Sequence, residues 1–358
     1  MSKIRVAILG QGRSGRDIHG AYLSRDPRRF SILAAVDPLA DRRRRAAEEY
    51  KCEVLRDHRP LLKRRDLDLI VNAAPSHLHV PISLQFLRAG FNVLCEKPLA
   101  ARAADVDRLI AAAKKARRVL AIFQQSRYAP YFQQVRKVIG SGVLGRIVQA
   151  SIASSGFARR WDWQTLRSWN GGNLLNTGAH LVDQALQLFG TDVMPQVACF
   201  MDRATTCGDA EDHVQLSLRG DGRPLVTVEI TSCCAYPSFT FQVYGTRGGL
   251  AGNASHLEWK HFKPAENPRR RLTRAPICNP DGTPAYCRDQ LKWHTRSWEV
   301  PAAKRDLFGS MSARFYRMLH KTLTAGAPLE ITPQEVRQQI AVIEACHRQN
   351  PAIYGKRR

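Results

Sequence analysis

The sequence is short of acidic residues. It has 55 lysines and arginines against 31 aspartates and glutamates, which leaves a formal net charge of +24 at pH 7. Such a field attracts nucleic acid and other anions. The basic residues are spread in short groups without interleaved aromatic residues, at 42–45, 63–65, 114–118 and 269–271. This distribution favours a solvated basic surface, and we expect no dedicated nucleic-acid partner.

Long apolar runs and paired cysteines are missing as well. No stretch approaches the roughly 18 uninterrupted apolar residues of a membrane span. The N-terminal residues lead directly into a predicted strand, without the apolar core of a secretory signal, so we expect a cytoplasmic protein with no membrane partner. The nine cysteines are scattered without a Cys-x-x-Cys pair. They predict neither a disulfide framework nor a metal site.

The chain has 358 residues and 44% hydrophobic content, which suggests about two globular domains. Up to residue 125, short apolar strands alternate with helical stretches, which predicts a doubly wound parallel sheet in a Rossmann domain over residues 1–125. The predicted strands cover Ile4–Leu9, Phe30–Val36, Glu53–Leu55, 69–73, Asn92–Cys95 and 119–123.

The pattern changes after residue 125. Longer alternating runs predict a large, mostly antiparallel open sheet with one covered face, in a second α/β domain over residues 126–358. These runs lie at 147–155, 193–200, 213–218, 225–232 and 239–244. We expect residues 263–301 to be irregular and two helices, 311–323 and Pro333–Gln349, to close the chain. The last helix is a candidate to pack back on the first domain.

A glycine motif follows the first predicted strand and precedes a helical stretch. In such a Gly-x-Gly-x-x-Gly motif the first glycine makes a tight turn, the second lets the backbone approach a pyrophosphate, and the third lets the helix pack on the strand. The predicted dinucleotide-binding residues are Gly10, Gly12, Arg13, Ser14 and Gly15.

Asp37 ends the second predicted strand. An acidic side chain there can accept hydrogen bonds from an adenosine ribose and repels a 2′-phosphate, which favours NAD. The nearby arginines 42–45 keep NADP open. A helix cap before Leu39 is the alternative role for Asp37.

Glu96 and Lys97 follow the strand Asn92–Cys95, which must stop at Pro98 because proline cannot donate to a ladder. Both side chains therefore lie where open α/β sheets bind ligands. A lysine partly desolvated beside a carboxylate can donate a hydrogen bond to a reacting oxygen. The alternative is a surface ion pair.

A predicted helix over 174–189 carries Asn176, His180 and Asp183 at i, i+4 and i+7, so the three share one face. Gly171 and Gly172 precede it and permit close approach of a ligand. A satisfied core histidine is the alternative, but three polar groups on one stripe favour a site.

The loop before these glycines is rich in tryptophan and arginine, with Trp163 near its centre. Indole rings stack on the apolar faces of sugars, which makes Trp163 a candidate substrate-binding residue. Packing over the sheet would explain the same residues.

Together these motifs resemble those of the Gfo/Idh/MocA oxidoreductase family, which includes inositol dehydrogenases and glucose–fructose oxidoreductase. The matching motifs cover nearly the whole chain: Gly10-x-Gly12-x-x-Gly15, Pro75-x-x-x-His79, Glu96-Lys97-Pro98, Gly142-x-x-Gly145, Gly171-Gly172, Asn176-x-x-x-His180-x-x-Asp183 and Gly245-Thr246-x-Gly248.

The resemblance implies hydride exchange between a nicotinamide and a sugar or cyclitol hydroxyl. It implies that Lys97 hydrogen-bonds the reacting oxygen, that His180 is the general base in oxidation, and that Asp183 binds a substrate hydroxyl. Further cofactor positions are Pro75, Ser76, His79, Glu96, Lys97 and Gln125; further substrate positions are Arg127, Tyr128 and Asn176. It also implies a homo-oligomer, a dimer or tetramer, formed through the open sheet.

Asn176 stands where many family members carry aspartate, and an amide cannot hold a charged imidazolium as a carboxylate does. The sequence thus predicts an NAD(P)-dependent oxidoreductase acting on a secondary hydroxyl or keto group of a sugar or cyclitol. Two alternatives stay open: a sugar lyase or glycosidase that oxidises its substrate transiently on bound NAD, and a non-catalytic binding or regulatory protein.

Overall fold

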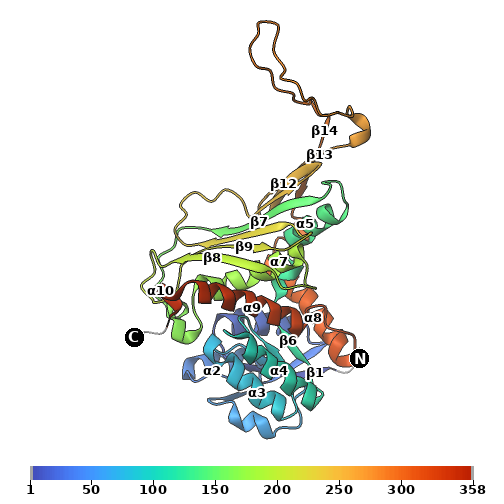
Figure 1. Ribbon diagram of the computed structural model, residues 1–358. Coiled ribbons are helices and arrows are strands. Elements are labelled where there is room, and N and C mark those ends of the chain that lie inside the picture. Colours follow the sequence, from blue (N-terminus) through green and yellow to red (C-terminus); the bar gives the residue numbers. More distant parts are fainter. Residues whose placement is uncertain (1–2, 356–358) are drawn as a thin grey trace.

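The first sheet of the protein is six-stranded and entirely parallel. A computed structural model describes residues 3–355 (Figure 1). The strand order is β3-β2-β1-β4-β5-β6, with Ile8 of β1 opposite Ala35 of β2 and Val71 of β4. The strands are β1 Ile4–Leu9, β2 Phe30–Val36, β3 Glu53–Leu55, β4 Leu69–Asn72, β5 Asn92–Cys95 and β6 Leu120–Ile122. The winding direction reverses between β1 and β4, which opens a crevice at their carboxyl ends.

Helical segments connect these strands, as the predicted βαβ alternation requires. They are η1 Ser14–Gly20, which is a π-helix, α1 Ala21–Arg25, α2 Ala40–Tyr50, η2 Arg59–Lys63, η3 Ser76–Leu78, α3 His79–Arg88, α4 Ala103–Ala116 and η4 Gln125–Tyr128. The predicted doubly wound sheet is confirmed.

The second sheet has eight strands in the order β14-β13-β12-β11-β7-β10-β9-β8, and only the β7–β10 pair is parallel. Its strands are β7 Ile147–Ser155, β8 Gln196–Asp202, β9 His213–Arg219, β10 Leu225–Thr231, β11 Phe241–Gly245, β12 Gly248–Gly252, β13 His256–Phe262 and β14 Trp293–Glu299. The prediction of a large, mostly antiparallel sheet is confirmed.

The expected irregular excursion over 263–301 is wrong at its far end. Trp293–Glu299 forms β14, which pairs antiparallel with β13. The intervening residues 263–292 carry the short helix η7 Pro264–Glu266 and an isolated bridge between Cys278 and Pro284, and they extend away from the body (Figure 1). Five of the seven residues of β14 are polar, so local composition gave no hint of the strand. The predicted helix over 174–189 is likewise two segments, α6 Asn173–Asn176 and α7 Gly178–Phe189.

The C-terminal helices join the two sheets. They are α8 Leu307–Ala325, α9 Pro333–Gln349 and the short α10 Pro351–Tyr354; α5 Pro130–Gly140 lies earlier in the chain. Helix α9 runs between the halves, contacting α4 and β6 on one side and α7 and β8 on the other (Figure 1). A capping box of Thr332 and Glu335 starts α9, and α8 lies against η1 and η4.

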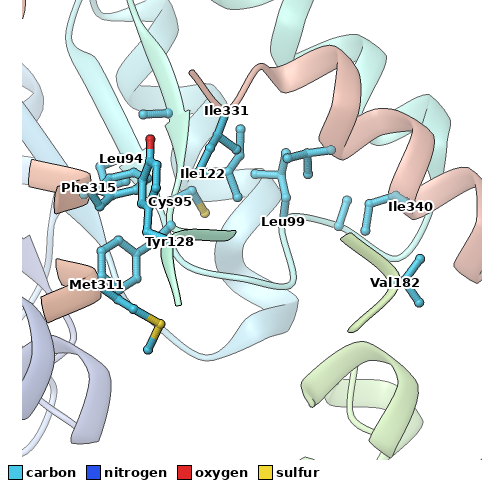
Figure 2. Packing of buried hydrophobic residues seen from close by; sticks show 14 of the residues in the cluster. Leu94, Cys95, Leu99, Ile122, Tyr128, Val182, Met311, Phe315, Ile331 and Ile340 are labelled. Atoms are coloured by element: carbon cyan, nitrogen blue, oxygen red, sulfur yellow. The ribbon is translucent and has the colours of Figure 1, made fainter. Parts of the chain in front are cut away.

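The apolar core is continuous across the two sheets. Figure 2 shows Leu94 and Ile122 of the parallel sheet close to Phe315 of α8, and Leu99 close to Ile340 of α9. All of these side chains are buried. Burial of apolar surface therefore fixes the C-terminal helices against the carboxyl ends of β5 and β6.

Candidate active site

The glycine motif has the shape that a dinucleotide requires. A Cβ on Gly10, whose φ is +86°, would lie 2.4 Å from the carbonyl oxygen of Ala73, and a Cβ on Gly15 would lie 1.8 Å from the carbonyl oxygen of Gly10. Those two positions exclude any side chain. At Gly12 the nearest atom to an added Cβ is Arg42 Nη1, at 3.6 Å. The space over Gly12 is therefore available to a pyrophosphate.

Asp37 lies at the end of β2, against the glycine motif. Its Oδ2 accepts the backbone N–H of Gln11 at 2.8 Å, and its Oδ1 accepts that of Leu39 at 2.9 Å. The carboxylate is only 2% exposed, and Arg42 Nη1 lies 3.5 Å from Oδ2. Asp37 thus holds the turn before α2. Leu39 is the N-cap of α2 and no side chain among the described residues caps it, so the helix-cap alternative for Asp37 is wrong.

Two glutamine side-chain oxygens near the crevice are acceptors that a polar cofactor could satisfy. Gln11 Oε1 and Gln125 Oε1 are buried and have no hydrogen-bond partner among the described residues. A buried acceptor without a partner is costly, so a ligand with N–H or O–H groups would satisfy these atoms. The sequence predicted Gln125 near the nicotinamide, and its Oε1, which has no donor among the described residues, could accept a hydrogen bond from the cofactor.

Other predicted cofactor residues contact neighbouring parts of the protein, and His79 is the clearest case. His79 is buried, with Nδ1 2.7 Å from the carbonyl oxygen of Pro98 and Nε2 2.8 Å from that of Ala74. Burial lowers its pKa. His79 therefore ties the loop after β4 to the loop after β5, and both of its nitrogens are engaged. Ser76 and Pro75 lie in the same loop after β4, and the Arg13 guanidinium lies 5.9 Å from the centre of the Phe308 ring of α8.

Lys97 lies directly after β5, and its ammonium points at Asn176. Nζ donates to the backbone oxygen of Asn176 at 3.2 Å and to Oδ1 at 3.3 Å. Burial lowers the pKa of Lys97; the charge of Glu96 opposes this, and Arg13 and Arg160 reinforce it. An ammonium has three N–H donors, so two directed at Asn176 leave one for a substrate oxygen.

His180 lies on α7, one turn beyond Asn176. Its Nδ1 is 2.9 Å from Ser126 Oγ, which leaves Nε2 for a substrate. Burial, together with the positive charge of Lys97, lowers the pKa of His180 to about 3. The imidazole is therefore neutral near pH 7 and able to accept a proton. The structure brings Lys97, Asn176 and His180 to one place.

Three predicted substrate-binding residues, Arg127, Tyr128 and Asp183, form hydrogen bonds with other side chains of the protein. Arg127 donates to both carboxylate oxygens of Asp183, at 3.1 and 2.5 Å, and to Glu335 of α9 at 3.0 Å. Tyr128 donates to Glu330 at 3.0 Å. Burial would lower the pKa of Arg127, but the charges of Asp183 and Glu335 raise it above its ordinary value. These contacts join η4, α7 and α9, and both oxygens of the buried Asp183 carboxylate are engaged by Arg127.

The tryptophan loop lies against the loop after β4. The rings of Trp163 and Trp169 are 5.8 Å apart, and Trp169 is 4.5 Å from His77. Asn170 Nδ2 donates to the carbonyl oxygen of Ser76 at 3.4 Å. Both indoles remain more than one third exposed. The loop therefore carries partly exposed aromatic faces beside the crevice.

The sequence interpretation missed three residues of this site. Ser126 orients His180; Gln164 accepts from Asn176 Nδ2 at 3.2 Å and from Arg160 at 2.5 Å; and His19 contacts Glu96 at 3.1 Å. Each contact joins residues that no helical or strand periodicity relates, so the sequence alone does not predict it.

Within residues 3–355, no helix is long and apolar enough to cross a membrane. In the same residues, no group of three or more His, Cys, Asp or Glu side chains is arranged to hold a metal ion.

Family models match both halves of the chain. One, described as an oxidoreductase family with an NAD-binding Rossmann fold, matches residues 4–124, and the GFO/IDH/MocA C-terminal domain matches residues 132–251. The protein therefore belongs to the GFO/IDH/MocA oxidoreductase family, an NAD-binding family, as the motifs predicted.

Similar proteins include an uncharacterized oxidoreductase, C26H5.09c, of Schizosaccharomyces pombe, 31% identical over 261 residues and 70% of each chain. A 2,7-anhydro-N-acetylneuraminate hydratase of Mediterraneibacter gnavus is 25% identical over 70% of this chain and 67% of its own. A D-glucoside 3-dehydrogenase of Escherichia coli is 29% identical over 55% of this chain and 57% of its own.

The fold also matches solved structures. The putative oxidoreductase yvaA of Bacillus subtilis superposes with a TM-score of 0.81 over 98% of this chain and 97% of its own, at 19% identity. At that identity the match supports the fold alone.

Proposed function

We propose that the protein transfers a hydride between a nicotinamide and a secondary hydroxyl or keto group of a sugar or cyclitol. The observation that carries this proposal is the meeting of the Lys97 ammonium and the neutral His180 imidazole around Asn176, beside the crevice above the glycine motif. A nicotinamide bound there would accept or deliver the hydride.

In the oxidation direction, His180 Nε2 accepts the proton of the substrate hydroxyl while Ser126 orients the ring through Nδ1. The third N–H of Lys97 donates to the same oxygen and stabilises the negative charge that develops on it. In reduction the two groups act in reverse. Asn176 supplies acceptors that aim the ammonium, and Gln164 fixes the Asn176 amide.

NAD is the cofactor we favour. The Asp37 carboxylate lies at the adenosine end of the crevice, where a 2′-phosphate would be repelled. NADP stays the alternative because the Arg42 guanidinium is 3.5 Å from that carboxylate. Gly10, Gly12 and Gly15 would cradle the pyrophosphate with Arg13 and Ser14, and Gln125 would face the nicotinamide.

A sugar ring would stack on the half-exposed indole of Trp163 or Trp169 while Lys97 and His180 hold the reacting carbon's oxygen. Dehydrogenation of a glucoside is the named activity of one similar protein, which supports this substrate class.

A lyase or glycosidase that oxidises its substrate transiently is the second candidate. One similar protein is a hydratase of an anhydro sugar, which favours this alternative. The same Lys97 and His180 would serve it, since the hydride would return to the sugar within one turnover.

We also propose a homo-oligomer, a dimer or tetramer, formed through the outer face of the second sheet. Phe200 on β8 is 75% exposed, and Val148 on β7 and Tyr244 on β11 are 45% exposed. Exposed apolar residues on a sheet face are typical of protein contacts. Light scattering of the purified protein tests this.

The decisive experiment incubates the purified protein with NAD or NADP and a panel of pyranosides, sugar acids and cyclitols, following absorbance at 340 nm and products by mass spectrometry. Net cofactor reduction supports the dehydrogenase. Product formation without net reduction supports the lyase or glycosidase. Neither result with any sugar, together with unimpaired NADH binding, favours a non-catalytic protein.

A further inference from the structure

A buried hydrogen-bonded chain links the C-terminal helix α8 to the reaction centre. The Tyr316 hydroxyl lies 2.7 Å from His19 Nδ1, and His19 Nε2 lies 3.1 Å from Glu96 Oε1. The other carboxylate oxygen, Glu96 Oε2, accepts the backbone N–H of Lys97 at 3.0 Å. Tyr316 and His19 are fully buried, and Glu96 is 4% exposed.

The direction of these hydrogen bonds follows from chemistry. Glu96 in its ionised form can only accept, so the proton between the two groups resides on His19 Nε2. Burial, with the neighbouring Glu96 charge, raises the pKa of Tyr316 well above its ordinary value, so the phenol keeps its proton. With the proton on Nε2, His19 Nδ1 is the acceptor that the Tyr316 hydroxyl faces at 2.7 Å.

Aromatic rings exclude water from the chain. His19 lies 4.5 Å from the Phe123 ring, and Tyr22 stacks on Tyr316 at 4.8 Å. Phe30 lies edge-on to Tyr316 at 5.4 Å. In such surroundings an ionised carboxylate persists only when hydrogen-bonded and paired. Burial would raise the pKa of Glu96, but the hydrogen bond and electrostatic attraction of His19, followed by the charge of Lys97, outweigh it and hold the pKa at about 2.

We propose that Tyr316 and His19 are positioning residues that keep Glu96 ionised and fixed next to Lys97, so that the lysine ammonium stays charged at the reaction centre. This inference rests on the proposed function of Lys97 as a hydrogen-bond donor to the substrate. Glu96 is the negative charge that supports the ammonium, because Asn176, its hydrogen-bonding partner, is neutral.

Several charged or titratable groups face Lys97 besides Glu96. Arg13 of the glycine motif and Arg160 of the tryptophan loop act against its charge, and His180 of α7 is neutral near pH 7. His79 of α3 interacts with Glu96, and burial lowers its pKa. Glu96 is therefore the group that opposes burial and both arginines. If the donor from His19 is lost, the Glu96 carboxylate is no longer held next to Lys97, so the ammonium loses part of its stabilising negative charge and gives up its proton at a lower pH.

The experiment measures the titration of Lys97 directly, without substrate. The full-length protein is labelled with [13Cε]lysine, the Lys97 signal is assigned by its loss in Lys97→Arg, and its shift is followed from pH 6 to 11. In Tyr316→Phe the midpoint is expected to fall by about 0.5–1 unit, and in His19→Leu by about 1–2 units. In His19→Gln, whose amide can still donate to Glu96, the fall is smaller than in His19→Leu.

Tyr22→Phe is the matched control, because it removes a hydroxyl from the same aromatic cluster. The Tyr22 hydroxyl donates to Asp26 and is not part of the hydrogen-bonded chain from Tyr316 to Glu96. Its midpoint should equal that of the wild type. Thermal unfolding of every variant identifies any that fails to fold, and Tyr316→Phe with His19→Gln decides the question if His19→Leu does not.

Folded Tyr316→Phe and His19 variants with the wild-type midpoint would overturn the inference. If the wild type transfers hydride, the alkaline limb of its kcat profile should move with the Lys97 midpoint in these variants. A wild type without hydride transfer to any sugar would instead defeat the proposed function, while the shifted midpoints would leave the positioning chain standing.

Discussion

Lys97 and Arg127 are two largely buried cations at the junction of the two sheets, and their surroundings differ sharply. Arg127 donates to two carboxylates, Asp183 and Glu335, through all parts of its guanidinium. Lys97 donates only to the amide and backbone oxygens of one asparagine, at 3.2 and 3.3 Å. The arginine is held by two carboxylates, whereas the lysine has only neutral acceptors at its ammonium and retains a donor.

This difference separates a structural charge from a functional one. A buried ion pair with every hydrogen bond made holds elements in place and has nothing to offer a ligand. A charge held by weaker partners, with a depressed pKa and an opposing carboxylate next to it, is typical of catalytic sites.

Replacing Lys97 should have the largest effect. In Lys97→Met, hydride transfer is expected to fall by about 10²–10⁴-fold, because the developing charge on the substrate oxygen loses its donor. Steady-state rates at 340 nm measure it, with NADH binding followed by fluorescence and expected to persist. Lys114→Met on the exposed face of α4 is the control. A rate within tenfold of the wild type would remove Lys97 from the mechanism.

Replacing Arg127 should instead cost stability. Arg127→Met leaves the buried Asp183 carboxylate and the partly buried Glu335 without their charged partner, so the free energy of unfolding is expected to fall by about 3–5 kcal/mol. Denaturant titration measures it. Arg337→Met is the matched control, because Arg337 pairs with Asp107 at 3.0 Å on the surface, and such pairs contribute about 0–1 kcal/mol. Equal losses in the two variants would contradict the contrast.

Asn176→Asp should make Lys97 resemble Arg127 by giving it a charged partner. The new carboxylate should raise the pKa of His180 from about 3 by about 1 unit or more. The acid limb of the kcat profile should move upward by the same amount, and an unmoved limb would count against His180 as the base.

The sign of the linked stability effect can be checked in the same variant. Since the folded-state pKa of His180 is lower than its unfolded value near 6.5, the unfolded state binds the extra proton first. The His180 contribution to stability is therefore present above pH 6.5 and declines as pH falls towards 3. In Asn176→Asp this decline should be shallower, which denaturant titrations at pH 4–7 can measure.

Arg42 is a third cation, half-exposed and weakly paired with Asp37 at 3.5 Å. Arg42→Ala should weaken NADPH binding about 2–5-fold more than NADH binding, because an exposed guanidinium gains little from a 2′-phosphate. Fluorescence titration with both cofactors measures this. Equal changes for the two would exclude Arg42 as a determinant of cofactor choice.

The sequence predicted the sheets wherever the signal was local. Strand β5 and the position of Lys97 followed from a buried run ended by Pro98, and the parallel sheet followed from regular alternation. Strand β12 has three glycines in five residues, and β14 is largely polar; both depend on ladders with neighbouring strands, which local composition does not reveal.

Within the site, helical spacing placed Asn176, His180 and Asp183 on consecutive turns. It did not predict which side chain each of them contacts. Asp183 meets Arg127, which lies 56 positions earlier, and His180 meets Ser126 across 54 positions. The helix is interrupted only at Thr177, whose φ of −73° and ψ of −41° are helical, so the spacing of the three residues is kept. Tertiary packing decides these partners, and a single sequence carries no record of it.

The position of helix α8 near the C-terminus affects when the N-terminal segment can complete its core during synthesis. A ribosome completes the first 125 residues long before Tyr316 emerges, yet Tyr316 fills the space beside His19 and Phe30 in that early segment. The nascent nucleotide-binding half must therefore wait, with an aromatic hollow open to water or chaperones, until nearly nine tenths of the chain has been translated. An excised N-terminal fragment would carry the same hollow permanently and would be a poor substitute for the whole protein.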